Sequence, residues 1–164
     1  MTRSRIGSRP NFQKQIMETI TAAETLEKKD SGRLFLVNAS TGYTITLPKA
    51  QVGLTFNFVF DVGGTDAAMK ITVGDTADYF YGQVHVTQSD AIDTLASQVV
   101  VKATALATPT SYDWLLFDAD ATATGGDVGS YVDITCTVDG GWLVIAHLGT
   151  SGTPGSIATI YAGA

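Results

Sequence analysis

Short segments with alternating apolar and polar residues follow one another from Arg33 onward, and this pattern constrains the fold more than any other feature. In residues 54–61 the even-numbered positions are Leu or Phe, and the odd-numbered ones are mostly polar. Such alternation predicts strands with one buried face. We predict further strands at 33–38, 43–47, 69–74, 78–87, 98–105, 112–118, 130–138, 142–148 and 157–161.

Turn residues separate these segments. The segments 130–138 and 142–148 are joined by Asp139–Gly140–Gly141, and Asp-Gly between two apolar runs predicts a hairpin. Parallel β-α-β architecture would require helices of ten or more residues between strands, and the pattern contains none. We therefore predict an all-β fold, a β-sandwich or jelly-roll-like barrel, with an extended N-terminal arm.

The N-terminal segment differs from this body in charge. Seven of the ten Lys and Arg residues lie in the first 33 positions, against four acids, and the remaining positions hold three cations and twelve acids, all Asp. This asymmetry predicts a cationic arm on an acidic body. We divide the chain into an extended basic arm at 1–15, a connecting segment of short helix or strand at 16–32, and a β-sandwich domain at 33–164.

The arm has too few apolar residues to fold alone, so we expect it to become ordered against a partner. Its cations are Arg3, Arg5, Arg9 and Lys14. Nucleic acid is not the expected partner, because four cations without interleaved aromatics are a weak signal and the acidic body repels phosphate. No apolar run approaches the length of a membrane span, and no secretory signal follows the basic start.

The inventory of catalytic residues is sparse, and we predict no enzyme and no cofactor. No nucleophile-elbow, zinc-protease, phosphate-loop or dinucleotide-binding motif occurs. His85 shares an exposed face with Gln83 and Thr87 in the alternating pattern, and we expect His147 to be a strand-end imidazole bonded to backbone. Cys136 is near His147 if the hairpin brings them together, but its apolar surroundings favour a buried thiol over a nucleophile.

Two further groups of residues have both a structural and a functional interpretation. Asp118 and Asp120 supply oxygen atoms suited to Ca²⁺, but they lack the third acid, the Gly and the distal Glu of an EF-hand loop, so we expect turn residues and no metal site. Alternation places Tyr79 and Tyr81 on one face and Phe80 on the other. We expect core packing and a subunit interface there, with a sugar-stacking platform as the alternative.

Two blocks of the chain carry a specific succession of turns and strands. The first runs from Thr25 to Phe60, and the second is GSYVDITCTVDGGWLVIAHLGTSGT. The pattern of the first is a Leu before an Asp-Ser-Gly turn, an apolar strand, a strand ending in Thr-Leu-Pro, and Gly-Leu-x-Phe-x-Phe. Here these are Leu26, Asp30–Ser31–Gly32, Leu34–Val37, Ile45–Pro48 and Gly53–Phe58.

In these motifs the two blocks resemble β-rich virion structural proteins of tailed bacteriophages, and this resemblance implies an assembly protein with no catalytic residues to carry over. Capsid decoration (cement) proteins are typically small, β-rich and often trimeric, and they commonly bind the capsid shell through an N-terminal arm. We therefore expect a homotrimer on the outer capsid surface of a virion, synthesised in the host cytoplasm and bound to the major capsid protein. The expected capsid-binding residues are Arg3, Arg5, Ile6, Arg9, Phe12, Lys14 and Ile16. The alternative is a carbohydrate- or host-receptor-binding domain of a tail or head fibre.

Overall fold

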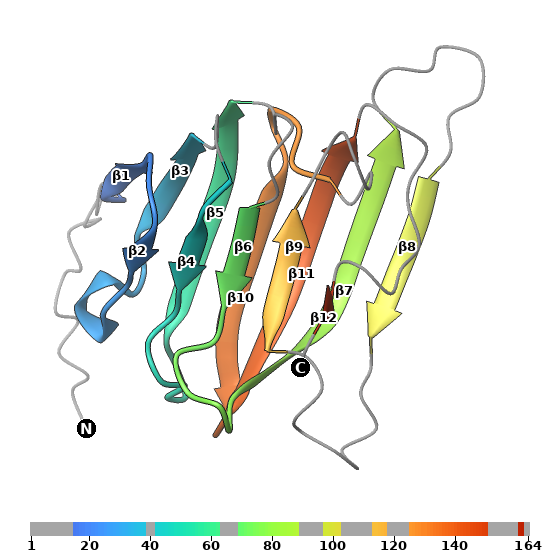
Figure 1. The fold of residues 1–164 in the computed structure, drawn as a ribbon. Helices are drawn as coiled ribbons and strands as arrows, with labels where there is room; N and C mark the ends of the chain where they lie inside the picture. Colours follow the sequence, from blue (N-terminus) through green and yellow to red (C-terminus); the bar gives the residue numbers. More distant parts are fainter. Residues whose placement is uncertain are drawn as a thin grey trace, which may run out of the picture.

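Two β-sheets pack face to face and enclose the core, which confirms the predicted all-β fold (Figure 1). The structure is a computed structural model that describes residues 15–38, 42–62, 69–88, 97–102, 113–117, 125–150 and 161–162. The seven-stranded sheet has the order β1-β3-β5-β10-β11-β7-β8, and the five-stranded sheet has the order β12-β9-β6-β4-β2. The strands are β1 Met17–Ile20, β2 Glu24–Thr25, β3 Leu34–Asn38, β4 Thr44–Thr46, β5 Thr55–Val62, β6 Met69–Thr72, β7 Tyr79–Gln88, β8 Ser97–Lys102, β9 Trp114–Phe117, β10 Tyr131–Val138, β11 Gly141–Thr150 and β12 Tyr161–Ala162.

The first six strands alternate between the two sheets, so that the chain coils around the core. β1, β3 and β5 are parallel neighbours in the seven-stranded sheet, and β2, β4 and β6 are parallel neighbours in the five-stranded sheet. Parallel neighbours need a crossover connection, and here a strand of the opposite sheet provides it. The structure is therefore free of β-α-β units in its described residues, as predicted, although it contains parallel strand pairs that the sequence analysis did not predict.

The segment 16–32, predicted to be a connection of short helix or strand, contains β1, β2 and a 3₁₀ helix, η1 (Lys28–Asp30). β1 pairs with β3 from Met17 opposite Leu34 to Ile20 opposite Val37. The Ile20 and Leu26 side chains are almost fully buried in the core. The segment is thus part of the sandwich; it is mainly strand, and its one short helix is the 3₁₀ turn at Lys28–Asp30.

The predicted hairpin is confirmed, and it has an unexpected place in the sheet. β10 and β11 pair antiparallel around Asp139 and Gly140, where Gly140 has a φ of +74°, a left-handed conformation that suits glycine. β10 also pairs antiparallel with β5, and β11 pairs parallel with β7. A hairpin near the end of the sequence, β10–β11, therefore lies in the sheet between β5 and β7, which come earlier in the sequence.

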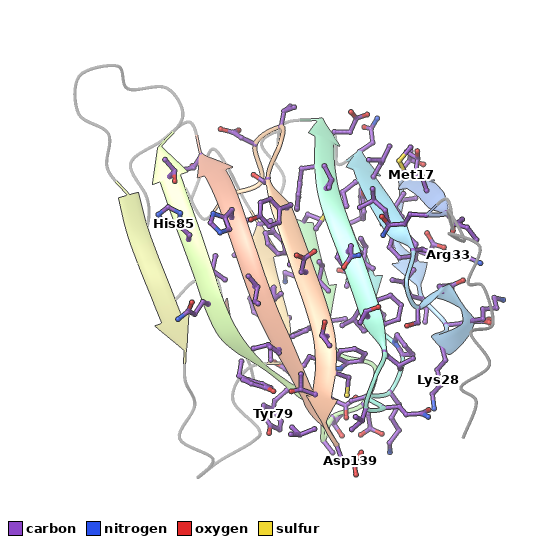
Figure 2. The ribbon with its side chains drawn as sticks, turned by 180° about the vertical axis from the view of Figure 1, so that it is seen from behind. Met17, Lys28, Arg33, Tyr79, His85 and Asp139 are labelled. Carbon is purple, nitrogen blue, oxygen red and sulfur yellow. The ribbon has the colours of Figure 1, made fainter. Side chains whose placement is uncertain are left out.

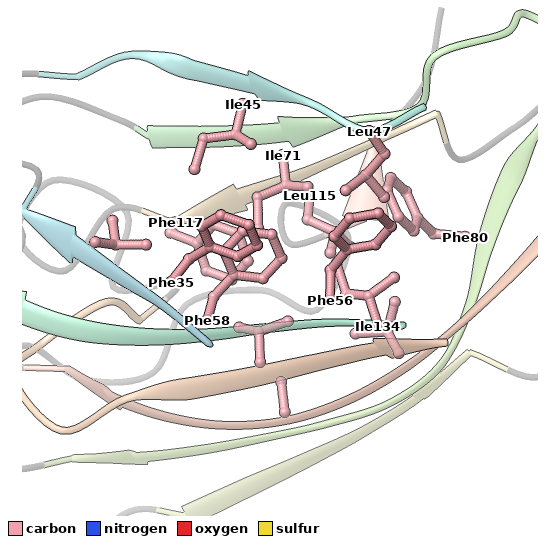
Figure 3. Close-up of a cluster of buried hydrophobic side chains, with 14 of the residues drawn as sticks. Phe35, Ile45, Leu47, Phe56, Phe58, Ile71, Phe80, Leu115, Phe117 and Ile134 are labelled. Atoms are coloured by element: carbon pink, nitrogen blue, oxygen red, sulfur yellow. The ribbon is translucent and has the colours of Figure 1, made fainter. Parts of the chain in front are cut away.

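The core is built from the inward-facing residues that the alternation predicted (Figure 3). The Phe35 ring lies 5.4 Å from that of Phe58 and 6.5 Å from that of Phe56, measured between ring centroids. Residues of the five-stranded sheet, among them Ile71 and Leu115, cover this cluster (Figure 3). Burial of each large side chain stabilises the fold by about 1.5–3 kcal/mol before entropy is counted, so this cluster dominates the packing.

Candidate functional site

The predicted arm meets the sandwich at the end of the seven-stranded sheet. Arg3, Arg5, Ile6, Arg9, Phe12 and Lys14 lie outside the described residues. Ile16 is described, and its carbonyl accepts a hydrogen bond of 3.0 Å from the Leu34 N–H. The side chains of Ile16 and Met17 are each 62% exposed, and β1 is the outermost strand of its sheet among the described residues (Figure 2). The chain therefore enters the sheet at an edge that carries two exposed apolar side chains.

Two of the three described cations of residues 15–33, Lys29 and Arg33, pair with acids, and the third, Lys28, bonds to Gln51. Arg33 Nη1 lies 2.7 Å from Glu18 Oε2 and 2.9 Å from Asp30 Oδ1, and these three side chains are partly buried. Lys29 pairs with Glu27 at 2.7 Å in an exposed position, where an ion pair adds little stability. Residues 15–33 hold three cations and four acids, whereas residues 1–14 hold four cations and no acid. All the net positive charge of the N-terminal segment thus belongs to the arm.

The seven-stranded sheet has one side that faces away from the five-stranded sheet, and Figure 2 views this side directly. Most of the described side chains on it are uncharged. We call the solvent-facing side chains of β7, β10 and β11 the outer face. Among the side chains described there, only Asp133 is an acid and none is Lys or Arg, whereas Ile145 is 49% and Tyr131 37% exposed. Asp133 is itself exposed, and desolvation by its neighbours raises the pKa of its carboxyl group. Exposed apolar and aromatic side chains with few charges are typical of surfaces that another molecule covers.

The three consecutive aromatics of β7 divide as the alternation predicted. Phe80 is fully buried, while Tyr79 and Tyr81 are half-buried on the outer face, with ring centroids 6.0 Å apart. A Cβ at Gly141 on the neighbouring strand would lie 3.2 Å from the Tyr81 ring and 3.3 Å from the Tyr79 hydroxyl. The Tyr81 hydroxyl also bonds to Thr137 Oγ1. The two tyrosine rings thus lie against Gly141 of β11, next to Thr137 and Val138 of β10.

A row of rings crosses the outer face at one register position. Tyr131, His147 and His85 are partners on β10, β11 and β7. The His147 ring stacks on Tyr131 at 5.0 Å and 18°, and it meets His85 edge-on at 5.3 Å and 78°. His85 shares its face with Gln83 and Thr87, as predicted. His147 instead lies within β11 and stacks on a side chain, so the expected strand-end position was wrong.

Two shallow hollows border His147. One, of about 280 Å³, is lined by Gln83, His85, Ile145, Ala146 and His147. The other, of about 250 Å³, is lined by His147, Thr87 and residues of the 128–130 turn and of 148–149. Both are smaller than the roughly 300–1,000 Å³ typical of sites for drug-sized ligands. They have room for an ion with its water, or for the tip of a partner's side chain.

The cysteine and the histidine considered as a catalytic pair lie on opposite faces of the sheet. Cys136 is buried on the inner face, burial raises the pKa of its thiol, and His147 lies on the outer face, so the two do not form a pair. No group of three or more His, Cys, Asp and Glu side chains is placed to hold a metal ion in the part of the chain that the structure describes. Asp118 and Asp120 lie outside that part.

None of the helices in the described ranges is long and apolar enough to cross a membrane. No protein-family model matches the chain, and a search of curated proteins finds no match to it.

Proposed function

We propose that this chain is a non-enzymatic structural protein of a tailed-phage virion that decorates and stabilises the capsid shell, docking through its basic N-terminal arm. The observation that supports the proposal is the separation of charge at the β1 edge. Lys29 and Arg33 pair with nearby acids, and residues 15–33 together hold three cations and four acids, so the arm alone carries net positive charge into a sheet edge with exposed Ile16 and Met17.

The proposed mechanism is stabilisation through a large area of contact with the capsid, and it involves no chemical reaction. The arm lies across neighbouring copies of the major capsid protein, where its four cations pair with carboxylates and Ile6, Phe12 and Ile16 supply apolar contacts. A ligand that binds only the assembled shell stabilises it by mass action. A homotrimer presents three linked arms, which raises the effective affinity through avidity. The acidic body faces outward on the virion and keeps particles mutually repulsive.

Deletion of residues 2–15 tests the proposal. We expect the truncated protein to keep its sandwich, because the deleted residues precede β1, and to lose co-sedimentation with phage particles assembled without the wild-type protein. Circular dichroism and urea unfolding check the fold, and sedimentation-velocity measurements check the trimer. Binding that survives the deletion would contradict the docking role of the arm.

A matched pair of charge variants separates the arm from positive charge in general. The first variant replaces Arg5 and Arg9 by Gln, and the second replaces Lys28 and Lys29 by Gln, so that each removes two positive charges. Lys28 Nζ bonds to Gln51 Oε1 at 2.9 Å, and Lys29 pairs with Glu27. We expect the first variant to lose capsid binding and the second to keep it, and equal losses would show that the arm has no special role.

A second candidate function is that of a carbohydrate- or host-receptor-binding domain of a fibre. The pair of half-exposed tyrosine rings on β7, Tyr79 and Tyr81, favours it, because neighbouring aromatic rings can stack on sugars. Glycan-array binding that Tyr79→Ala or Tyr81→Ala abolishes would support this candidate. An array without specific signal, together with capsid binding that depends on the arm, would exclude it.

A further inference from the structure

We infer that His85 and His147 form a binding site for a first-row transition-metal dication, Zn²⁺ or Cu²⁺, which goes beyond the proposed capsid function. These are the two histidines of the whole 164-residue sequence. The parallel pairing of β7 with β11 places them directly opposite each other on the outer face. Chain segments far apart in sequence thus bring both imidazoles of the protein into contact.

The separation of the two rings suits a shared ion. Their centroids lie 5.3 Å apart. Two imidazoles that bind one tetrahedral ion with Zn–N bonds of about 2.0–2.1 Å have centroids about 5 Å apart. The strands therefore need not move for both rings to bind, and side-chain rotation alone can turn one nitrogen of each ring towards the ion. An imidazole pair is a donor set that Cu²⁺ and Zn²⁺ accept, whereas Ca²⁺ and Mg²⁺ prefer oxygen.

The surroundings support the ligands and leave space for the ion. Tyr131 stacks on His147 with ring centroids 5.0 Å apart, from the strand on the side opposite His85, so the His147 imidazole lies between an aromatic ring and the second imidazole. The 280 Å³ hollow lies between the two imidazoles, Gln83 and Ile145, and can hold an ion with coordinated water. Asp133, the partner of Ile145 in the β10–β11 ladder, adds a negative charge to the same face. Two protein ligands leave the remaining coordination positions to water, so the site is open.

The test uses the full chain without an affinity tag, because tag histidines would bind the same ions. Isothermal titration with CuCl₂ and with ZnCl₂ should give one site per chain, with Cu²⁺ bound more tightly than Zn²⁺, and MgCl₂ should give no signal. His85→Gln and His147→Gln should each weaken binding by at least about tenfold, in line with the effect of disturbing a metal-ligand set. The control Gln83→Ala, which borders the same hollow, should bind as tightly as the wild type.

A spectroscopic measurement on the wild-type protein is independent of how the variants fold. Addition of Zn²⁺ should shift the imidazole proton resonances of both histidines together, saturating at one equivalent. Absence of binding, binding that survives both histidine substitutions, or a shift of one imidazole alone would overturn the inference.

Discussion

At the scale of single residues, Asp78 is a buried carboxylate at a junction of turns. It is 3% exposed, and its Oδ2 accepts a hydrogen bond of 2.7 Å from the Ala50 N–H. It precedes β7, next to the Lys49–Asp75 ion pair, in which the Lys49 ammonium lies 2.8 Å from Asp75 Oδ2. Burial raises the pKa of Asp78, while that of Asp75 is lowered by its bond to Lys49. Asp78 thus fixes the turn before β5 to the start of β7.

We expect Asp78→Ala to lower the free energy of unfolding by about 1–3 kcal/mol, because the Ala50 N–H loses its acceptor. Asp78→Asn keeps an acceptor oxygen and should lose less. The native state holds the proton more tightly than the unfolded state, so stability from Asp78 is full below its unfolded pKa and falls as pH rises through its folded pKa. Urea unfolding measured between these two pKa values should show that the difference in unfolding free energy between the wild type and the Asn variant becomes smaller as the pH rises. Equal losses for both variants would contradict the hydrogen-bond role.

Cys136 offers a simple probe of the folded state, since it is the one cysteine in the sequence. Its side chain is 1% exposed, and burial raises the pKa of the thiol. Reaction with a disulfide reagent needs an accessible thiolate. We expect no labelling of the native protein at neutral pH and full labelling in urea, following the unfolding transition measured by circular dichroism. Rapid labelling without denaturant would show that β10 is not packed as described.

At the scale of elements, local periodicity predicted the strands well. The segment 54–61 was predicted and β5 is Thr55–Val62, and the segment 78–87 was predicted and β7 is Tyr79–Gln88. Alternation is a local signal, so it also predicted which residues of these strands face the core. It says nothing of which strands become neighbours. The parallel pairing of β7 with β11, and with it the contact between His85 and His147, depends on the whole sheet and could not be predicted from either segment.

The pairing of β7 with β11 depends on Gly82. Gly82 has a φ of +135°, and a Cβ there would lie 2.0 Å from the Val144 carbonyl oxygen. We expect Gly82→Ala to carry the cost of a positive φ, roughly 1–2 kcal/mol, plus about 1–3 kcal/mol because the two strands must separate. The control Gly53→Ala has a φ of +95° and meets no described atom within 4 Å, so it carries the first cost alone.

Urea unfolding of both glycine variants measures the difference. A larger loss for Gly82→Ala than for Gly53→Ala is expected, and equal losses would mean that β7 and β11 do not approach as closely as the structure places them.

At the scale of the whole molecule, charge is distributed in two parts of opposite sign. The first 14 residues hold four cations and no acid, and the rest of the chain holds six cations and sixteen acids. The sequence alone predicted this asymmetry. It did not predict the ion pairs of Lys29 and Arg33, because their contacts with Glu18, Glu27 and Asp30 depend on the folded positions of β1 and η1.

We expect added NaCl to weaken capsid binding of the wild-type protein steeply, because exposed charges are screened within about 10 Å at 0.1 M salt. The free energy of unfolding of the sandwich should change far less, since its core is apolar. Co-sedimentation across a salt series, with urea unfolding in the same buffers, measures both quantities. Capsid binding that does not respond to salt would contradict docking through the arm's cations.

The position of the β10–β11 hairpin has a consequence for how the chain can fold as it leaves the ribosome. β5 and β7 emerge early, but their neighbours β10 and β11 are translated only with residues 131–150. Until then the coil of β1–β6 can begin to form, while the inner edges of β5 and β7 have no native partner. Unpaired strand edges favour association between chains. A nascent chain stalled before residue 131 is therefore at its most aggregation-prone, and release of the hairpin closes the sheet.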